Sequence, residues 1–365
     1  MDQDKPIFDK EKDTDVPDPD ETPIRDRKVV TQPYDIAIQS LVEQVKNDTI
    51  FLRPLSSRPR YQRQYVWTNP LASRLIESIL LNVPVPPCYL SQNDEFELDV
   101  IDGQQRIYSL FRYLENQFPL SSLEVLKEIS GRRFFELDPK IQRQLKTYSL
   151  RCVLITNESH PEIKFDVFER LNTNTVPLNA QELRNCIYRG PLNNLLGDIS
   201  GEKGFLDILG RKSPDKRLRD EELVLRFFAF ELLGLESYKT PQKHWLNDVA
   251  KLGRKINNDE VDRLKAVWEL AISNVLEWFD PKDAFRRPGS RAVNRALFDL
   301  LMSTAKKMDA SVAKSKAKKM RQLVDLMLQS EEFSDLISRA VDHKKRTNRR
   351  FELWRMSVEE PILAG

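Results

Sequence analysis

The feature that most constrains the fold is a change of hydrophobic period within residues 96–114. Residues 96–101 alternate between apolar and polar positions, which predicts a half-buried β-strand. From residue 107 to residue 114 the apolar side chains recur at i, i+3, i+4 and i+7, the spacing of an amphipathic helix. Gly103 lies between the two segments, and glycine allows both a sharp turn and the close approach of a ligand. We therefore expect a strand to lead directly into a helix at this glycine.

This corner has the chemistry of an anion-binding site. The first N–H groups of a helix have no partner within the helix and lie at the positive end of its dipole. Arg106, in the first turn, adds a positive charge and a planar guanidinium group that suits phosphate. The same residues would also make a tight corner with a surface arginine. Taken alone, they leave both interpretations open.

Two further stretches strengthen the first interpretation. Residues 58–67 read RPRYQRQYVW, and residues 69–81 predict a helix that a proline-rich segment ends. Together, the motifs YQRQYVW, LIESILLNVPVP and IDGQQR resemble the ParB-like family that includes the N-terminal domain of the GmrSD modification-dependent restriction enzymes. Further matches lie at residues 168–174, 178–184 and 219–228, so the resemblance covers roughly residues 30–235.

The resemblance implies a nucleotide site at the corner. In ParB and its relatives the segment that matches residues 103–106 grips the phosphates of a nucleotide. The phosphate contacts implied here are Gly103, Gln104, Gln105 and Arg106, with Arg63 as a second clamp and Gln62 as its polar neighbour. Asp102, Gln105 and Arg106 would carry any slow hydrolysis of the bound nucleotide.

Polar residues further along the chain could complete this pocket. Asn172 and Asn174 suit hydrogen bonds to a base or a ribose, and equally suit a turn. Glu182 and Arg184 could pair locally on a helix or reach the nucleotide.

Whether a metal takes part depends on the acidic residues. Asp102 could orient Arg106, reach a Mg²⁺ ion through water, or cap the helix that follows it. CTP-binding ParB proteins place a carboxylate in the phosphate motif, where this chain has Gln104 or Gln105. An amide cannot bind a cation as a charged ligand. The expected cofactor is therefore a nucleoside triphosphate, whether ATP, GTP or CTP, and the use of Mg²⁺ stays open.

Nuclease chemistry is not expected from this chain alone. GmrSD-type enzymes carry a separate HNH nuclease domain, which needs a histidine base. The three histidines of this chain are isolated from one another, so we expect a stand-alone member without that domain. Residues 162–164 form a Glu-x-Lys, as in another nuclease class, but no obvious strand carries it. The absence of a GxxxxGK[ST] loop excludes a Walker-type NTPase.

Composition and periodicity divide the chain into three parts and predict an α+β fold. Residues 1–22 carry nine acidic and three basic side chains, so residues 1–29 are predicted to be a disordered acidic tail. Residues 30–175 are predicted to form a ParB-like nucleotide-binding domain, a small mixed sheet with helices packed on it. Residues 176–365 are predicted to form an all-helical domain. Its helices are expected at residues 221–235, 261–279, 291–307, 313–328 and 332–343.

Basic density gathers in three runs that could bind DNA or form solvated helix faces, at residues 211–219, 314–321 and 344–350. The predicted DNA-binding residues are Lys344, Lys345, Arg346, Arg349 and Arg350. No apolar run approaches the roughly 20 residues that span a bilayer. The N-terminus does not resemble a signal peptide, and Cys88, Cys152 and Cys186 form no metal motif. We therefore expect a cytoplasmic protein with no membrane partner.

The expected function is a nucleotide-dependent, DNA-associated component of a prokaryotic restriction or anti-phage system. It would bind and slowly hydrolyse a nucleoside triphosphate and act with a partner nuclease or ATPase subunit. One alternative is a non-catalytic DNA-binding or regulatory module in which the DGQQR motif only braces the fold. Another alternative is a self-sufficient endonuclease. The sequence does not determine the oligomeric state.

Overall fold

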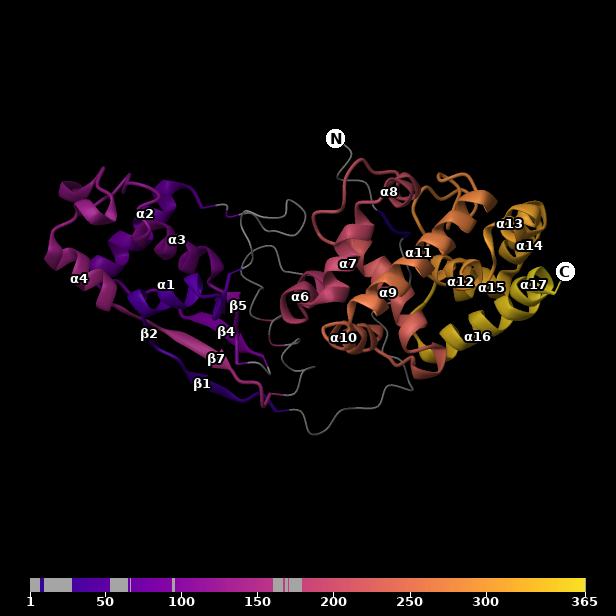
Figure 1. Cartoon of the computed structure of the whole chain (residues 1–365), viewed down its shortest axis with the longest axis horizontal. Helices are drawn as coiled ribbons and strands as arrows, with labels where there is room; N and C mark the ends of the chain where they lie inside the picture. Colours follow the sequence, from indigo (N-terminus) through magenta and orange to yellow (C-terminus); the bar gives the residue numbers. More distant parts are fainter. Residues whose placement is uncertain are drawn as a thin grey trace. The chain divides into compact units, whose positions relative to one another are not determined.

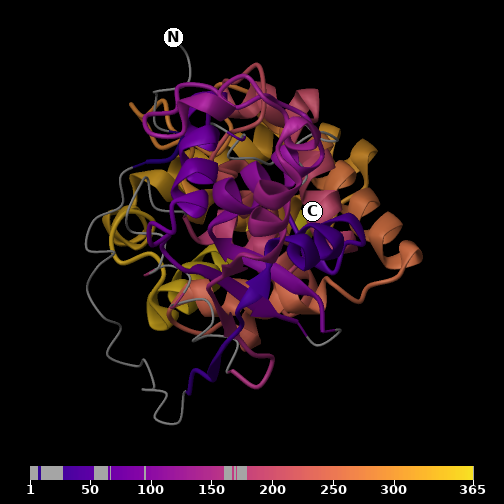
Figure 2. The same cartoon turned by 90° about the vertical axis from the view of Figure 1, so that its left-hand side faces the viewer.

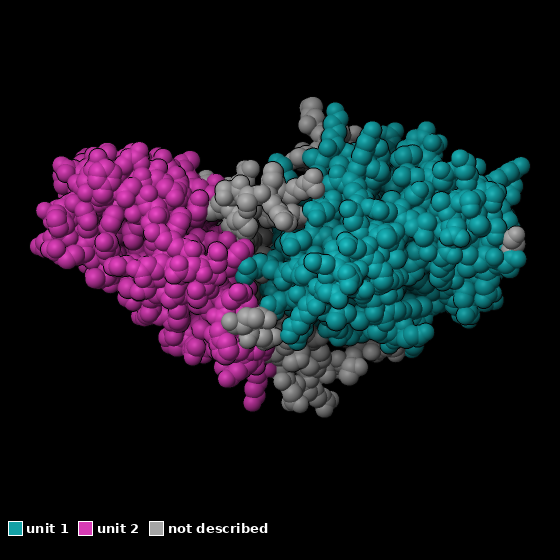
Figure 3. All heavy atoms as spheres, viewed as in Figure 1, with its two compact units in different colours: residues 1–23, 180–365 teal, residues 24–179 magenta. Residues whose placement is uncertain are grey.

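The computed structural model describes residues 7–9, 28–52, 65, 67–93, 96–159, 167, 170 and 179–364. The chain divides into two compact units, which Figure 3 distinguishes by colour. One unit comprises residues 24–179 and is called the N-terminal unit; the other comprises residues 1–23 and 180–365 and is called the helical unit. The first contains a small mixed sheet and the second is built from helices, which confirms the predicted α+β fold class. Among the described residues, none of the helices is both long and apolar enough to cross a membrane.

The N-terminal unit is organised around a five-stranded sheet of order β1-β7-β4-β5-β3. Its strands are β1 (Thr31–Pro33), β3 (Ile50–Phe51), β4 (Cys88–Gln92), β5 (Leu98–Asp102) and β7 (Cys152–Ile155). Strand β4 pairs antiparallel with β5 and parallel with β7, so the sheet is mixed. A second pair joins β2 (Ile36–Ala37) to β6 (Ser149–Leu150). The adjacent strands β6 and β7 therefore belong to different sheets.

Four α-helices lie together on one side of these strands (Figures 1 and 2). They are α1 (Ile38–Lys46), α2 (Asn69–Leu80), α3 (Gln104–Leu114) and α4 (Pro139–Thr147), with short 3₁₀ turns η1 (Lys127–Ile129) and η2 (Phe134–Glu136). Their fully buried side chains include Leu41, Ile76, Ile79, Ile107 and Leu110, which pack into one core with β4 and β5. Helix α1 begins at Ile38, directly after the two residues of β2.

Figure 1 shows the helices of the helical unit packed together. Their buried side chains form one core that is rich in aromatic residues. The longer helices are α6 (Ala180–Ile187), α7 (Pro191–Ser200), α8 (Lys203–Leu209), α9 (Arg219–Leu232), α10 (Gln242–Leu252), α11 (Asn258–Trp278), α12 (Arg295–Ala305), α14 (Ala317–Gln329) and α16 (Lys344–Trp354). Shorter ones are η4 (Leu235–Ser237), α13 (Ala310–Ser315), α15 (Glu331–Leu336), the π-helix η5 (Arg355–Glu359) and α17 (Glu360–Leu363). Trp245, Trp268, Trp278 and Trp354 are among its largest fully buried side chains.

Three of the expected helices in this unit form close to their predicted segments, with shifted ends, and one predicted segment is wrong. Helices α9, α11 and α12 occupy three of the segments predicted from periodicity. The segment predicted as a helix over residues 332–343 ends at Leu336, and the chain begins a new helix at Lys344. The new helix was not predicted because its sequence is dominated by basic residues, which conceal the apolar positions on one of its faces.

Residues 7–9 belong to the helical unit. The Ile7 side chain is buried in its core, and Phe8 forms a parallel bridge with Val293. The guanidinium Nε of Arg287 donates to Asp9 Oδ2 at 2.7 Å. For these three residues the expectation of a disordered tail over residues 1–29 is therefore wrong, because an apolar pair followed by a carboxylate finds a complementary surface on the helical unit.

Candidate nucleotide-binding site

The strand-to-helix corner at Gly103 is built as predicted, and its geometry excludes any side chain. Gly103 has φ = 95°, in the left-handed region, and is the N-cap residue of α3. A Cβ atom at this position would lie 2.4 Å from Cys88 Sγ and 3.3 Å from the backbone Cα of the same residue. Glycine is thus required both for the backbone conformation and for the contact with β4.

Arg106 is held on two sides within the first turn of α3. Its Nη2 donates to Asp102 Oδ2 at 2.7 Å, and its Nη1 donates to the carbonyl oxygen of Pro86. The Arg106 side chain is only 12% exposed, whereas that of Asp102 is 43% exposed. No side chain caps α3, so of the roles considered for Asp102 the structure shows the orientation of Arg106 and not helix capping.

The two glutamines of the motif have different surroundings. Gln105 Oε1 accepts a hydrogen bond from the backbone N–H of Trp67 at 3.3 Å, which ties the upstream aromatic segment to α3. Gln104 is partly buried, and its Nε2 atom has no hydrogen-bond partner among the described residues. A buried amide donor without an acceptor is costly unless water or a ligand supplies one. Gln104 therefore fits a position beside an acceptor-rich ligand.

The aromatic residues of the YQRQYVW segment pack on α3. Tyr65 shares a hydrogen bond with Ser109 at 2.9 Å, and its ring meets that of Tyr108 edge-on with centroids 5.0 Å apart. The guanidinium of Arg112 lies 4.8 Å from the centroid of the Tyr65 ring. Trp67 packs against the core of the N-terminal unit. Gln62 and Arg63 lie outside the described residues, so their predicted phosphate contacts stay predictions.

A pair of thiols beneath the corner was not anticipated from the sequence. Cys88 and Cys152 are in register on the adjacent strands β4 and β7, and both are fully buried. A hydrogen bond with Cys152 lowers the pKa of the Cys88 thiol, and the nearby charge of Arg106 acts in the same direction. The positive charge of Arg106 therefore contributes to the lowered pKa of a thiol on the adjacent strand β4. The spacing of the cysteines gave no sign of this contact, because strand pairing brings them together.

The residues of the QELR motif lie in the helical unit and pair there. Arg184 is buried, and its Nε donates to Asn247 Oδ1 at 2.9 Å while its Nη1 donates to Glu222 Oε2 at 2.9 Å. Glu182 pairs with Arg217 at 3.0 Å. These contacts link α6 to α9, α10 and the loop before α9. Asn172 and Asn174 are outside the described residues.

The predicted DNA-binding run on α16 is largely engaged within the helical unit. Arg350 is fully buried and donates through Nη1 to the carbonyl oxygen of Val341. Its assignment to DNA is therefore wrong, because a guanidinium enclosed in the core cannot reach a phosphate. Arg346 pairs with Asp335 at 2.6 Å, and Arg349 pairs with Glu332 at 2.9 Å.

The other two basic runs also make internal contacts. Arg219 pairs with Asp215 at 2.8 Å. Although burial raises the pKa of the Asp215 carboxyl, its contacts with neighbouring arginines outweigh that effect and hold the pKa below its usual range. Lys316 and Lys319 donate to carbonyl oxygens of α17, at Ile362 and Pro361. Cations near the last carbonyls of a helix stabilise that end of the helix. These contacts favour the interpretation of the runs as structural faces.

Among the described residues, no three His, Cys, Asp or Glu side chains are grouped so as to hold a metal ion.

Part of this chain is similar to a known family. Residues 38–189 match the family described as GmrSD restriction endonuclease, N-terminal domain. The matched segment begins with α1, contains the whole Gly103 corner, and extends through α6, including Arg184. No curated protein and no solved structure matches the chain. Residues 38–189 are therefore similar to the N-terminal domain of the GmrSD restriction endonucleases.

Proposed function

We propose that the N-terminal unit binds a nucleoside triphosphate at the first turn of α3, and that the bound state controls how a restriction system engages DNA. A partner nuclease would cut the DNA. The observation that supports this most directly is the Gly103 corner, where a bare backbone turn is followed at once by an arginine oriented by Asp102. The family match is to a restriction-related protein family.

In this proposal the phosphate oxygens accept hydrogen bonds from backbone N–H groups at the start of α3 and from Arg106. The buried Nε2 of Gln104 supplies a further donor. Asp102 is the more exposed member of its ion pair, so it can turn towards a phosphate-bound cation and release Arg106 to the phosphate. Mg²⁺ is commonly held by one or two carboxylates together with substrate phosphates, and a single aspartate fits that pattern.

Slow hydrolysis would use the same residues. Gln105, whose Oε1 accepts a hydrogen bond from the backbone N–H of Trp67, would orient a water molecule in line with the terminal phosphate. Attack by that water would release inorganic phosphate and the nucleoside diphosphate. Arg106 would stabilise the charge that develops on the phosphate oxygens.

A second candidate is the regulatory module in which the motif is a brace. One observation favours it: Arg106 already joins the end of β5, through Asp102, to the segment before β4, through Pro86. These bonds need no ligand. In that case the chain would bind DNA or a partner protein without any nucleotide.

Calorimetric titration of the full chain with ATP, GTP and CTP, with and without Mg²⁺, separates the two candidates. We expect one triphosphate to bind, and Arg106→Ala to weaken binding by about 1.5–3 kcal/mol, the scale of a hydrogen bond to a charged group. Arg106→Lys should recover only part of the loss, because lysine lacks the planar fork. Arg74→Ala is the matched control, since Arg74 is an exposed, ion-paired arginine of the same unit.

If the wild-type chain binds none of the three triphosphates, the brace is the correct interpretation. A separate incubation of the pure chain with plasmid DNA and a divalent metal tests the third candidate, a self-sufficient endonuclease. Cleavage would contradict the proposed need for a partner nuclease.

A further inference from the structure

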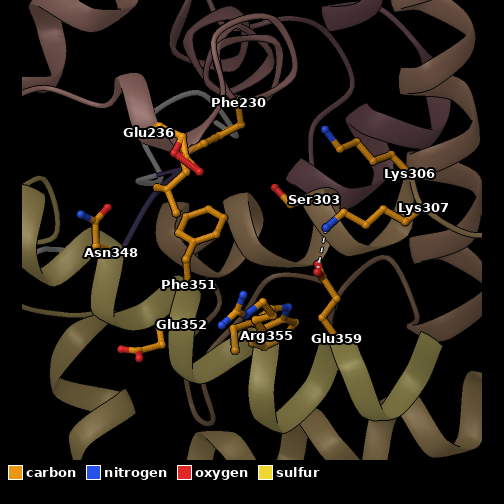
Figure 4. A pocket seen from close by; sticks show the side chains of 12 residues that line it. Phe230, Glu236, Ser303, Lys306, Lys307, Asn348, Phe351, Glu352, Arg355 and Glu359 are labelled. Atoms are coloured by element: carbon orange, nitrogen blue, oxygen red, sulfur yellow. Dashed lines mark hydrogen bonds and ion pairs between the residues drawn. The ribbon is translucent and has the colours of Figure 1, made fainter. Parts of the chain in front are cut away.

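The helical unit contains a cavity of about 370 Å³ that the candidate nucleotide site does not use (Figure 4). It lies between the turn η4, the last turn of α12 and the joined helices α16 and η5. Asn348, Phe351 and Trp354 line it from α16 at spacings of three residues, and Arg355 continues the lining at the start of η5. A volume near 300 Å³ or above is typical of pockets that enclose a small ligand.

The walls of this cavity are joined by a chain of hydrogen bonds. Trp354 Nε1 donates to Thr304 Oγ1 at 2.9 Å, and Thr304 Oγ1 donates to Glu359 Oε2 at 3.2 Å. Lys307 Nζ donates to Glu359 Oε1 at 2.7 Å. Residues 355–359 form a π-helix, an element often found at functional sites. The π-helix is thus fastened to α12, and the cavity is preformed.

The base of the cavity is aromatic. Figure 4 shows the Phe351 ring in the middle of the lining, between the lysines of α12 on one side and Asn348 on the other. Its centroid lies 4.9 Å from that of Phe230, which is itself packed against Trp245 at 4.9 Å. Phe351 is partly exposed while Phe230 is buried. One ring is therefore supported from below and presents a surface on which a planar group can stack.

The hydrogen-bonding groups of the lining favour an uncharged polar ligand. Its three cations, Lys306, Lys307 and Arg355, each lie within ion-pair distance of a glutamate. By contrast, the side chains of Ser303, Glu236 and Asn348 make no hydrogen bond or ion pair with any described residue. A polyphosphate would find its potential partners already neutralised. A carboxylate, an amide and a hydroxyl are instead suited to sugar hydroxyls and to the edge of a base.

We propose that this cavity binds the nucleoside part of a nucleotide, with the base stacked on Phe351. Asn348 would hydrogen-bond to the edge of the base, and Glu236 would accept hydrogen bonds from the sugar hydroxyls. This site is independent of the proposed triphosphate site at α3, because its cations are all paired and it lies in the other unit. The nucleoside could be free or part of a nucleic-acid strand, and the two sources share the same chemistry.

Saturation-transfer NMR and equilibrium titration of the full chain test the proposal. The probes are adenosine, guanosine, cytidine, thymidine and a short single-stranded oligodeoxynucleotide. We expect at least one probe to bind saturably and Phe351→Leu, which keeps the apolar volume, to weaken it about tenfold or more, the effect of losing base stacking. Glu236→Gln should weaken it several-fold. Phe135→Leu is the control, since Phe135 is an exposed phenylalanine of the N-terminal unit.

Arg106→Ala separates this site from the one proposed at α3. Nucleoside binding should survive in that variant even where triphosphate binding is lost. Binding of the oligonucleotide but not of free nucleosides, with the same dependence on Phe351, identifies a strand as the source. The proposal fails if no probe binds, or if binding is unchanged by Phe351→Leu and Glu236→Gln. Because Glu236 makes no bonds to described residues, Glu236→Gln still decides the matter if the Phe351 variant does not fold.

Discussion

At the scale of single residues, Gly103 and Arg106 perform different tasks at the same corner. Gly103 allows the chain to turn against Cys88, and Arg106 joins the two ends of the strands next to it. A ligand would occupy the space left by the absent side chain of Gly103 and accept hydrogen bonds from the guanidinium of Arg106. The two residues therefore make distinct contributions to stability, which substitutions can separate.

Gly103→Ala should lower the free energy of unfolding by about 2–4 kcal/mol. The alanine would have to adopt the left-handed conformation, and its Cβ would overlap with Cys88. Gly131→Ala is the matched control. Gly131 has a similar φ of 82°, but a Cβ atom there would meet nothing within 4 Å, so only the backbone strain remains. That strain costs about 1–2 kcal/mol. Thermal and urea melts of the two variants measure the difference. Equal losses would show that the contact with Cys88 costs nothing.

Arg106→Ala should destabilise the N-terminal unit even without a ligand. It removes an ion pair at 2.7 Å and the donor to the Pro86 carbonyl, and its own side chain is mostly buried. We expect a loss of about 1.5–3 kcal/mol. Arg74→Ala removes an exposed pair with Glu124 and should cost less than about 1 kcal/mol. Chemical denaturation compares them, and an equal loss would mean that the Arg106 contacts contribute no more than a surface pair.

At the scale of elements, the first turn of α9 contains a buried acid that opposes folding at neutral pH. The Asp220 carboxylate is fully buried and accepts bonds from the backbone N–H groups of Asp215 and Glu221. Burial raises the pKa of Asp220 to about 6, and those two bonds only partly compensate. The Asp220 carboxyl at the start of α9 therefore binds its proton more tightly in the folded chain than in the unfolded chain.

The raised pKa of Asp220 makes the stability of the folded chain decrease as pH rises. Because the folded pKa is the higher one, the folded state binds the proton more tightly, and stability from this group falls as pH rises from about 4 to about 6. Asp220→Asn should remove a pH-dependent change of about 2–3 kcal/mol in the free energy of unfolding over that range. Any hydrogen bond lost in the variant changes the free energy of unfolding by the same amount at every pH. Melting temperatures of both proteins between about pH 4 and about pH 7.5 give the difference. Parallel curves for the two would contradict the raised pKa.

At the scale of the whole molecule, residues of the helical unit precede and follow the N-terminal unit in the sequence. Residues 7–9 pack into the helical unit, residues 28–159 build the N-terminal unit, and the chain from residue 180 returns to the helical unit. The unit that carries the candidate nucleotide site is therefore an insertion within the helical unit. The N-terminal segment is consequently part of the fold of a domain whose remaining sequence lies more than 170 residues away.

Removal of residues 1–9 should destabilise the helical unit by about 2–4 kcal/mol, because it uncovers the site of a buried isoleucine and leaves Arg287 without Asp9. The matched control removes residues 2–6 and keeps Ile7, Phe8 and Asp9. Differential scanning calorimetry of both truncations shows whether the loss depends on those three residues. An unchanged transition in the longer truncation would mean that the segment is dispensable, as the composition of residues 1–29 suggests.

The sequence by itself determined the local features of this protein. The change of period at Gly103, the strand that leads into it and the switch to helices in the second half follow from which positions are apolar, and that pattern depends only on residues close together in the sequence. The glycine at the corner and the arginine in the next turn were also identifiable, because a strand-to-helix turn needs the first and places the second at the helix start.

Only the tertiary structure decided which polar groups meet. The basic run on α16 reads as a surface feature, yet Arg350 is enclosed because Val341 supplies a carbonyl and the neighbouring helices cover it. Likewise Cys88 lies under Gly103 because β4 and β5 pair, and Ile7 is buried because Val293 offers an open strand partner. Periodicity states which face of an element is apolar, but the partner of a polar side chain comes from another element, and that choice depends on packing across the whole chain.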